Sequence, residues 1–218
     1  MQHLAFIDFE TTGLRAGTDR IIEVGAVLLR DGEIVATFAE LMDPGFHIPS
    51  FITQLTGISN AMVRGKPRPE AVMPRLRAFL GDHPCIAHNA SFDQRFFTAE
   101  MALAGQQHER TFVCSMLLAR RLLQQAPSHK LGVLVQHLRL ATPPGLHAHR
   151  ALDDVLMTCE LWRHLTTDLR TRINARALDL ELIRSVIAKP KAAVAAHLAQ
   201  LAQLPALAQL SAQAQHAS

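Results

Sequence analysis

A short apolar segment near the N-terminus leads directly into two carboxylates. Leu4–Ile7 is followed by Asp8 and Glu10, two residues apart. Because the side chains of a strand alternate between two faces, this spacing predicts that Asp8 and Glu10 point to the same side of a sheet. Neighbouring carboxylates repel each other, and burial increases the repulsion. The segment therefore predicts part of a Mg²⁺ or Mn²⁺ site, with a solvated strand end as the alternative.

The composition fits one α/β domain with an appendage. The chain has 218 residues, 49% hydrophobic and 19% charged, enough for a sizeable core. Its three cysteines, Cys85, Cys114 and Cys159, lie far apart without metal-ligand spacing, which argues against a disulfide framework and favours a reducing cytoplasm. With neither a signal peptide nor a membrane span visible, we expect a cytoplasmic protein without a membrane partner.

The charges are distributed unevenly along the chain. Residues 1–110 carry 10 Lys and Arg against 13 Asp and Glu, whereas residues 111–218 carry 12 against 6. The acidic half suits metal binding and the basic half suits a polyanion. The overall net charge of +3 is weak for a nucleic-acid binder, so this pattern is only suggestive.

Apolar periodicity predicts a mixed sheet with helices packed on it. Three strands form an antiparallel meander in which Asp31-Gly32 is a tight turn, and alternating helices and short strands follow. The predicted strands are 4–9, 21–30, 33–41, 85–87 and 111–114. The predicted helices are 52–55, 69–80 with Pro74 inside, 92–104, 116–123, 131–138 and 150–165.

Beyond about Asp168 the composition changes. Residues 171–187 keep helical periodicity, and the chain after 191 is rich in Ala, Leu and Gln. The segment 201–210 is either an amphipathic helix interrupted at Pro205 or a poorly ordered tail. We therefore predict a domain over 1–168, and a helical extension with an Ala/Leu/Gln-rich tail over 169–218.

Two further clusters carry acidic and imidazole side chains. His88 to Asp93 lies where a strand leads into a helix, and His149 to Asp154 begins the last large helix. Each has an ordinary explanation. Asp93 could be a helix N-cap, and Asp153 and Asp154 could form an acidic first turn.

Together, the three clusters resemble the motifs of the DEDDh 3′→5′ exonuclease superfamily. The similarity is greatest to the proofreading epsilon subunit of bacterial DNA polymerase III and to the exonuclease domain of Gram-positive replicative polymerases. The matching segments are Phe6-Ile7-Asp8-Phe9-Glu10-Thr11-Thr12-Gly13-Leu14, His88-Asn89-Ala90-Ser91-Phe92-Asp93 and His149-Arg150-Ala151-Leu152-Asp153-Asp154. The resemblance covers about residues 3–166.

This resemblance implies an α/β, RNase H-like exonuclease fold with a central mixed five-stranded sheet flanked by helices. It also implies two divalent cations, Mg²⁺ or Mn²⁺. Asp8 would bridge both, Glu10 and Asp154 would complete the tighter site, and Asp93 would hold the second cation through water. His149 would deprotonate the attacking water, a role that suits a neutral imidazole near pH 7.

The family spacing selects between adjacent candidates and suggests the substrate contacts. It selects Asp154 over Asp153 and His149 over His147. The resemblance further implies that the turn after the first motif contacts the 3′-terminal nucleotide, with Leu14 against the terminal base. The predicted substrate-binding residues are Thr11, Thr12, Gly13, Leu14, His88 and Asn89. Phe92 is expected in the core, and Phe96-Phe97 is expected to supply one buried and one exposed ring.

The leading hypothesis is a metal-dependent 3′→5′ exonuclease that releases nucleoside monophosphates from single-stranded or frayed DNA ends, in proofreading or repair. A 3′→5′ exoribonuclease similar to RNase T or oligoribonuclease is the first alternative. A catalytically silent nucleic-acid-binding or polymerase-associated scaffold is the second. The segment after the exonuclease domain, about 171–215, could join the protein to a DNA polymerase subunit.

Overall fold

The computed structural model describes residues 3–106, 110–143, 145 and 149–204 of the chain. It divides into two compact units. The first comprises residues 1–114 and 141–159, and the second comprises residues 115–140 and 160–218. All the motif residues named above that the structure describes belong to the first unit.

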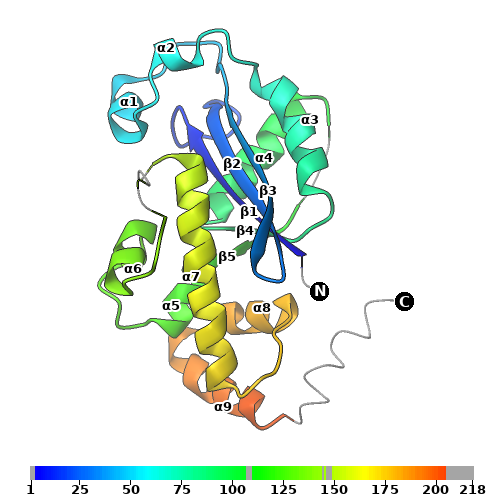
Figure 1. The fold of residues 1–218 in the computed structure, drawn as a ribbon, viewed down its shortest axis with the longest axis vertical. Helices are drawn as coiled ribbons and strands as arrows, with labels where there is room; N and C mark the ends of the chain where they lie inside the picture. The colour runs from blue at the N-terminus through cyan, green and yellow to red at the C-terminus, as the bar shows by residue number, and fades with distance from the viewer. Residues whose placement is uncertain (1–2, 107–109, 144, 146–148, 205–218) are drawn as a thin grey trace. The chain divides into compact units, whose positions relative to one another are not determined.

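The first unit is built on a mixed five-stranded sheet, as predicted (Figure 1). The strands lie in the order β3-β2-β1-β4-β5. They are β1 (His3–Thr11), β2 (Ile21–Arg30), β3 (Glu33–Leu41), β4 (Cys85–Ala87) and β5 (Phe112–Cys114). The first three form the antiparallel meander, while β4 pairs in parallel with both β1 and β5.

The local sequence explains this arrangement. Phe6 and Ile7 of β1 and Val24 and Val27 of β2 are buried, which places the two strands in the middle of the core. The β2–β3 hairpin turns at Asp31-Gly32, where both residues have positive φ, +53° and +93°. That conformation is the one a tight two-residue hairpin turn requires, so the predicted turn is confirmed.

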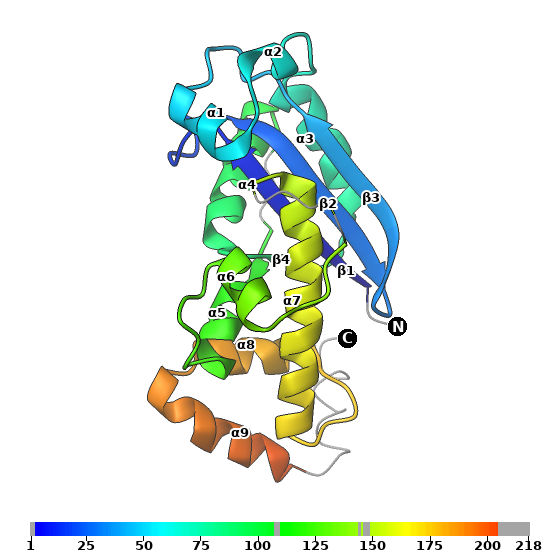
Figure 2. The same cartoon turned by 60° about the vertical axis from the view of Figure 1, so that its left-hand side comes forward.

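Helices cover both faces of this sheet. The helices of the first unit are α1 (Ser50–Thr56), α2 (Asn60–Val63), α3 (Pro69–Leu80), α4 (Ser91–Leu103) and the beginning of α7 (Ala151–Arg172). Helices α3 and α4 lie on one side, and the beginning of α7 lies on the other (Figures 1 and 2). A small apolar cluster that includes Ile22, Ile48 and Ile58 anchors α1 and α2.

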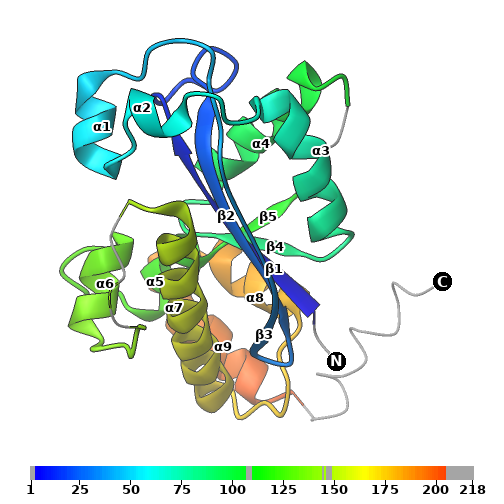
Figure 3. The ribbon, with the colours of Figure 1, turned by 45° about the horizontal axis from the view of Figure 1, so that its top comes forward.

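The second unit is helical. Besides the end of α7, it contains α5 (Ser115–Leu122), α6 (Leu131–His137), α8 (Leu180–Ala188), the 3₁₀ turn η1 (Lys191–Ala193) and α9 (Val194–Ala202) (Figure 3). Arg121 of α5 donates from Nε to the Ile187 carbonyl at 3.1 Å, which ties α5 to α8. No helix in the described part of the chain is both long enough and apolar enough to span a membrane.

The C-terminal helices differ from the predicted boundaries. Helix α7 continues past 165 to Arg172, so position 168 lies inside it. It ends because Asn174 takes a left-handed conformation (φ +51°), and the Ala175 N–H bonds back to the Arg170 carbonyl at 3.0 Å. Helix α8 then begins only after Asp179, whose carboxylate caps the Leu182 N–H. The division at 168 stays a prediction, and residues 205–218 lie outside the described part.

Candidate active site

The first two carboxylates lie at the carboxyl end of the central strand β1. Asp8 is opposite Gly25 of β2, and Glu10 is opposite Glu23. Their spacing puts both on the same face of the sheet, as the sequence predicts. A register shift between Glu10 and Thr11 ends the regular pairing immediately afterwards. Glu10 is only 8% exposed, so this strand end is not a solvated one.

Asp93 comes to β1 from the first turn of α4. Its side chain is 2% exposed, and Oδ1 accepts a hydrogen bond from the Phe9 N–H at 3.2 Å. Phe9 stands between Asp8 and Glu10, so this bond attaches Asp93 to the same strand end. The N-cap position of α4 is occupied by Ala90. The N-cap alternative for Asp93 is therefore wrong, because its carboxylate binds a strand 84 residues away.

The third motif approaches from the start of α7. Ligand atoms of Glu10, His149 and Asp154 lie within 4.8 Å of one another. The His149 N–H donates to Asp154 Oδ2 at 3.2 Å, and His149 itself has φ +64°. A positive φ is uncommon for a residue with a side chain and persists only where surrounding contacts hold it.

The electrostatics of this cluster are unfavourable without a cation. Burial raises the pKa of Asp8 well above its usual value, and Asp93, Asp154 and Glu10 raise it further. Burial raises the pKa of Glu10 to about 8, reinforced by Asp154. Burial also raises the pKa of Asp93 to about 8 and that of Asp154 to about 6. Each shift reflects a carboxylate whose charged form is destabilised.

This donor set fits hard divalent cations. Carboxylate oxygens are the ligands that Mg²⁺ and Mn²⁺ prefer, and a divalent cation would offset the repulsion that raises these pKa values. Asp8, Glu10, Asp93 and Asp154 are the carboxylates with raised pKa values at this strand end. A metal role for them is therefore compatible with the surroundings that the structure shows.

The sequence analysis assigned no role to one carboxylate beside this cluster, although it lies in Arg20-Ile21-Ile22-Glu23-Val24-Gly25, a segment that also resembles the superfamily. Glu23 is 7% exposed and faces the same side as Glu10, its cross-strand partner. Both of its oxygens are bound by the third motif, at the start of α7. Arg150 contacts Oε1 at 2.6 Å, and the Ala151 N–H donates to Oε2 at 2.9 Å. The two-residue alternation along β2 and the hairpin register were the available signals.

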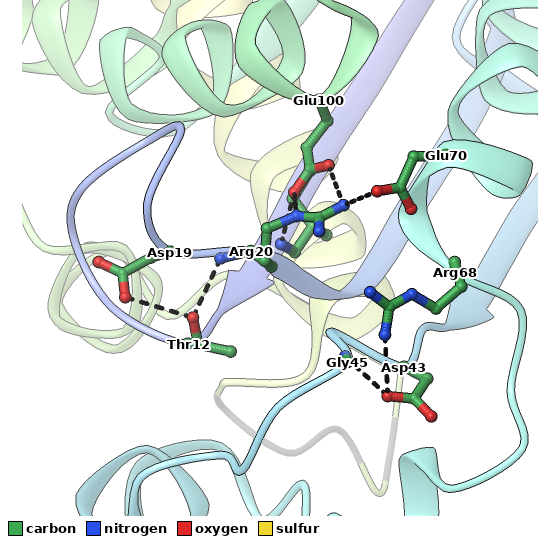
Figure 4. Close-up of polar contacts among 9 residues, drawn as sticks. Thr12, Asp19, Arg20, Asp43, Gly45, Arg68, Glu70 and Glu100 are labelled. Atoms are coloured by element: carbon green, nitrogen blue, oxygen red, sulfur yellow. Dashed lines mark hydrogen bonds and ion pairs between the residues drawn. The ribbon is translucent and has the colours of Figure 1, made fainter. Parts of the chain in front are cut away.

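The turn after β1 is held in shape by its own polar groups (Figure 4). The Arg20 N–H donates to Thr12 Oγ1 at 3.0 Å, and the Asp19 carboxylate accepts from the Thr12 hydroxyl and the Arg15 N–H. A Cβ on Gly13 would lie 2.5 Å from the Asp19 carboxylate, so a larger residue there would have to displace the Asp19 side chain that holds the turn. Leu14 at the turn is 78% exposed.

Arg20 fastens this turn to the body of the first unit, and Figure 4 shows its guanidinium between two carboxylates. It donates to Glu100 of α4 at 2.8 and 2.9 Å and to Glu70 of α3 at 2.7 Å. Glu100 is 1% exposed and also accepts the Ile21 N–H at 3.2 Å. The sequence analysis gave Arg20 and Glu100 no role, because neither motif spacing nor periodicity connects them.

The remaining candidates have mixed outcomes. His88 and Asn89 lie in the turn between β4 and α4, where Asn89 is exposed and has φ +69°. Phe96 and Phe97 are both fully buried, so the expected exposed ring is wrong. The reason is that each ring packs against another aromatic residue, Phe96 against Phe92 and Phe97 against Phe112. His147 lies outside the described residues.

The family model for exonucleases (RNase T) matches residues 5–162. The chain belongs to this exonuclease family. Two DNA polymerase III PolC-type proteins are similar. That of Clostridium perfringens is 38% identical over 154 residues, covering 71% of this chain and 10% of its own length. That of Thermotoga petrophila is 38% identical over 182 residues, covering 83% of this chain and 13% of its own length. The chain therefore spans about a tenth of the length of these relatives.

Solved exonuclease structures share the fold. Exonuclease X in complex with 5′ overhanging duplex DNA is 32% identical, with a TM-score of 0.65, covering 85% of this chain and 99% of its own. Escherichia coli exonuclease I with a dT13 oligonucleotide has a TM-score of 0.68 at 16% identity, covering 80% of this chain and 43% of its own. At that identity the similarity shows the fold alone. The predicted superfamily and RNase H-like fold are confirmed. Family and fold together imply a nuclease that uses divalent cations.

Proposed function

We propose that this exonuclease-family chain is a 3′→5′ DNA exonuclease that hydrolyses the terminal phosphodiester bond and releases nucleoside monophosphates. The observation that carries the proposal is the meeting of Asp8, Glu10, Asp93 and Asp154 with His149 at one strand end. These carboxylates have raised pKa values because burial and mutual repulsion destabilise their charged forms, and they lie beside an exposed imidazole. Perturbed pKa values of this kind cluster at functional sites, which supports a nuclease site here.

Each acidic residue has an assigned task in this proposal. Asp8 would help to hold both divalent cations, Glu10 and Asp154 would hold one of them, and Asp93 would hold the other. Bound there, the cations would stabilise charge on the attacking and leaving oxygens. Mg²⁺ is proposed as the physiological ion, because the donors are all hard oxygens and Mg²⁺ binds phosphate substrates together with one or two carboxylates.

His149 is proposed as the general base. Its side chain is exposed at the edge of the cluster, and its backbone N–H is tied to the Asp154 carboxylate. An imidazole so placed could take a proton from water near neutral pH. His149→Gln is expected to lower kcat by roughly 10²–10⁴-fold, the range of a lost general base.

The substrate is proposed to be the 3′ end of single-stranded or frayed DNA. Thr11, Thr12, Gly13 and Leu14 would contact the terminal nucleotide, with His88 and Asn89 near the neighbouring phosphate. DNA is favoured over RNA because the exonuclease X structure, 32% identical over nearly its whole length, contains duplex DNA with an overhang. An exoribonuclease is the competing outcome that the assay must separate.

The test is a paired degradation assay. The protein is incubated with 5′-labelled single-stranded DNA and with RNA of the same sequence, with Mg²⁺ or with EDTA. We expect a ladder of shortened DNA products only with Mg²⁺, and slower loss of RNA. Asp8→Asn should abolish the ladder, whereas Asp82→Asn, at an exposed aspartate of the same unit, should not. Faster RNA degradation would reassign the substrate, and an intact Asp8→Asn ladder would overturn the mechanism.

A role in proofreading would require a polymerase partner, and we propose that residues 171–215 provide the contact. The support is the similarity to PolC-type polymerases and the helical segment that follows the family match at residue 162. Co-purification with a polymerase subunit should be lost when residues 171–218 are deleted. A complex that survives the deletion would remove this part of the proposal.

A further inference from the structure

The third motif is held to the sheet by a contact that lies outside the motifs. Glu23 on β2 accepts hydrogen bonds from two guanidinium nitrogens of Arg150, Nε and Nη2, at 2.6 to 3.2 Å. The same carboxylate accepts the N–H of Ala151, the first residue of α7, at 2.9 Å. Arg150 directly follows His149, so the anchored segment is the one that carries the proposed base.

These bonds do for α7 what a capping side chain does for an ordinary helix. The first N–H groups of a helix have no partner within the helix. Here a carboxylate from a strand 128 residues away supplies the acceptor for Ala151, and its negative charge is favourable at a helix N-terminus. The direction and position of α7 are thereby set relative to β2.

The backbone around His149 needs such an anchor. His149 has φ +64°, a strained conformation for a residue with a side chain that persists when neighbouring contacts over-determine it. The His149 N–H donates to the Asp154 carboxylate. The two residues that follow His149, Arg150 and Ala151, are bound by Glu23. Without Glu23, the bonds from His149 N–H to the Asp154 carboxylate at 3.2 Å and from Asp154 N–H to the Arg150 carbonyl at 2.9 Å would remain, but neither of them connects this segment to β2.

A glycine on the same strand makes the approach possible. A Cβ on Gly25 would lie 2.3 Å from the Leu152 nitrogen and 2.4 Å from the Ala151 carbonyl carbon. The α7 backbone therefore rests directly on β2, two residues along the strand from Glu23. Glu23 and Gly25 together define one docking position for the start of α7.

Arg150 also keeps Glu23 apart from the carboxylate cluster. Glu23 faces the same side of the sheet as Glu10 and is opposite it in the register. With both oxygens engaged by Arg150 and Ala151, Glu23 is poorly available as a further ligand. The pair thus separates a positioning carboxylate from the proposed metal-binding ones.

We propose that Glu23 is a positioning residue, whose contacts with Arg150 and the Ala151 N–H fix His149 and Asp154 in place beside Glu10. The role rests on the proposed nuclease function of that site. Outer partners that orient metal ligands typically contribute roughly 10–100-fold to activity or metal affinity. The expected effect of losing Glu23 is therefore on the chemical step, with DNA binding by Thr11 to Leu14 little changed.

The test uses the full-length chain with graded variants. Glu23→Gln keeps one oxygen to accept the Ala151 N–H but loses the charge, and Glu23→Leu loses both contacts. We expect kcat to fall roughly tenfold for Glu23→Gln and roughly 100-fold for Glu23→Leu, with KM within about twofold. Glu40→Gln is the matched control, because Glu40 also pairs with an arginine, Arg75, in the same unit.

A second measurement does not depend on activity. Hydrogen–deuterium exchange of the metal-free proteins should show faster exchange in residues 150–154 of the Glu23 variants, with α3 and α4 unchanged. Normal kcat and normal exchange in 150–154 would overturn the proposal. The proposal would also be overturned if kcat fell and exchange became faster throughout the sheet, because that pattern indicates general destabilisation. A wild-type chain without nuclease activity would instead overturn the proposed function, while the exchange result still tests the anchor.

Discussion

Gly25 of β2 lies directly beneath the Ala151 carbonyl of α7, with no room for a side chain between them. A Cβ there would come within 2.4 Å of the Ala151 carbonyl carbon and 2.6 Å of its oxygen. These are backbone atoms, which cannot move aside as a flexible side chain can. The close approach is what brings the third motif to the β1 carboxylates.

Gly25→Ala is therefore expected to destabilise the protein by about 1–3 kcal/mol, the range for overpacking a filled site. Urea unfolding followed by circular dichroism measures this. Gly132→Ala is the control, since Gly132 lies in α6 with open space around it, and alanine there should be neutral or stabilising by up to about 1 kcal/mol. Equal unfolding free energies for wild type and Gly25→Ala would contradict the packing described.

Arg20→Met is expected to cost far more than the loss of a surface ion pair. Arg20 is 11% exposed and Glu100 only 1%, so the substitution leaves a buried carboxylate without its partner. Breaking such a pair typically costs about 3–5 kcal/mol. Arg75→Met, at a half-exposed arginine paired with Glu40, should cost less than about 1 kcal/mol.

The measurement for this pair of variants is again the free energy of unfolding. The double variant Arg20→Met, Glu100→Leu provides a check, because removing both charges leaves no unpaired carboxylate at Glu100. It should be more stable than Arg20→Met alone. If the single and double variants lose the same stability, the buried pair is not the source of the effect.

Residues close in sequence were the ones that could be predicted. Asp8 and Glu10 follow a two-residue alternation, and His149 and Asp154 match the five-residue spacing of the exonuclease motif that the chain resembles. The hairpin at Asp31-Gly32 is equally local. In each case a short segment determines the geometry, and the structure brings the predicted side chains to the same strand end.

Residues that depend on distant partners could not be found in this way. Glu23 meets Arg150 across 127 residues, and Arg20 meets Glu100 across 80. As single charged residues they look like ordinary surface positions until the fold buries them. The end of α7 was also misjudged, because the buried apolar repeat of Leu165, Leu169 and Ile173 continues beyond 165 and the left-handed Asn174 ends the helix.

Leu14→Ala is expected to weaken substrate binding without affecting folding. Leu14 is 78% exposed, so its truncation removes little buried surface in the free protein. Against a terminal base it would bury apolar area, and losing about 1–1.4 kcal/mol of that contact corresponds to a five- to tenfold rise in KM. Steady-state kinetics on single-stranded DNA should show this rise with kcat nearly unchanged.

Leu103→Ala is the matched control for Leu14, because Leu103 is a half-exposed leucine at the end of α4 and is not among the turn residues proposed to contact the substrate. Its KM should equal that of the wild type. A lower kcat with unchanged KM for Leu14→Ala would place Leu14 in the chemical step and contradict a role in gripping the 3′ end.

Metal-free protein should lose stability as the pH rises. The pKa of Glu10 is raised from 4.5 to about 8, and that of Asp93 from 3.8 to about 8. Between about pH 4.5 and 8 the folded state therefore holds protons that the unfolded chain has released, so the free energy of unfolding falls with pH across this window. Thermal melting in EDTA at pH 5 and pH 8 measures the difference.

Asp8→Asn isolates the contribution of the carboxylate cluster to this trend. Removing one charge relieves the repulsion that raises the neighbouring pKa values, so the variant should melt higher than wild type in EDTA at pH 8, although it has lost activity. Each 1 kcal/mol gained raises Tm by about 2–4 °C in a chain of this size. Mg²⁺ should stabilise the wild type much more than the variant at pH 8. The contrary result is a wild-type protein whose Tm in EDTA rises from pH 5 to pH 8 relative to that of Asp8→Asn. It would show that repulsion among these carboxylates does not destabilise the folded state.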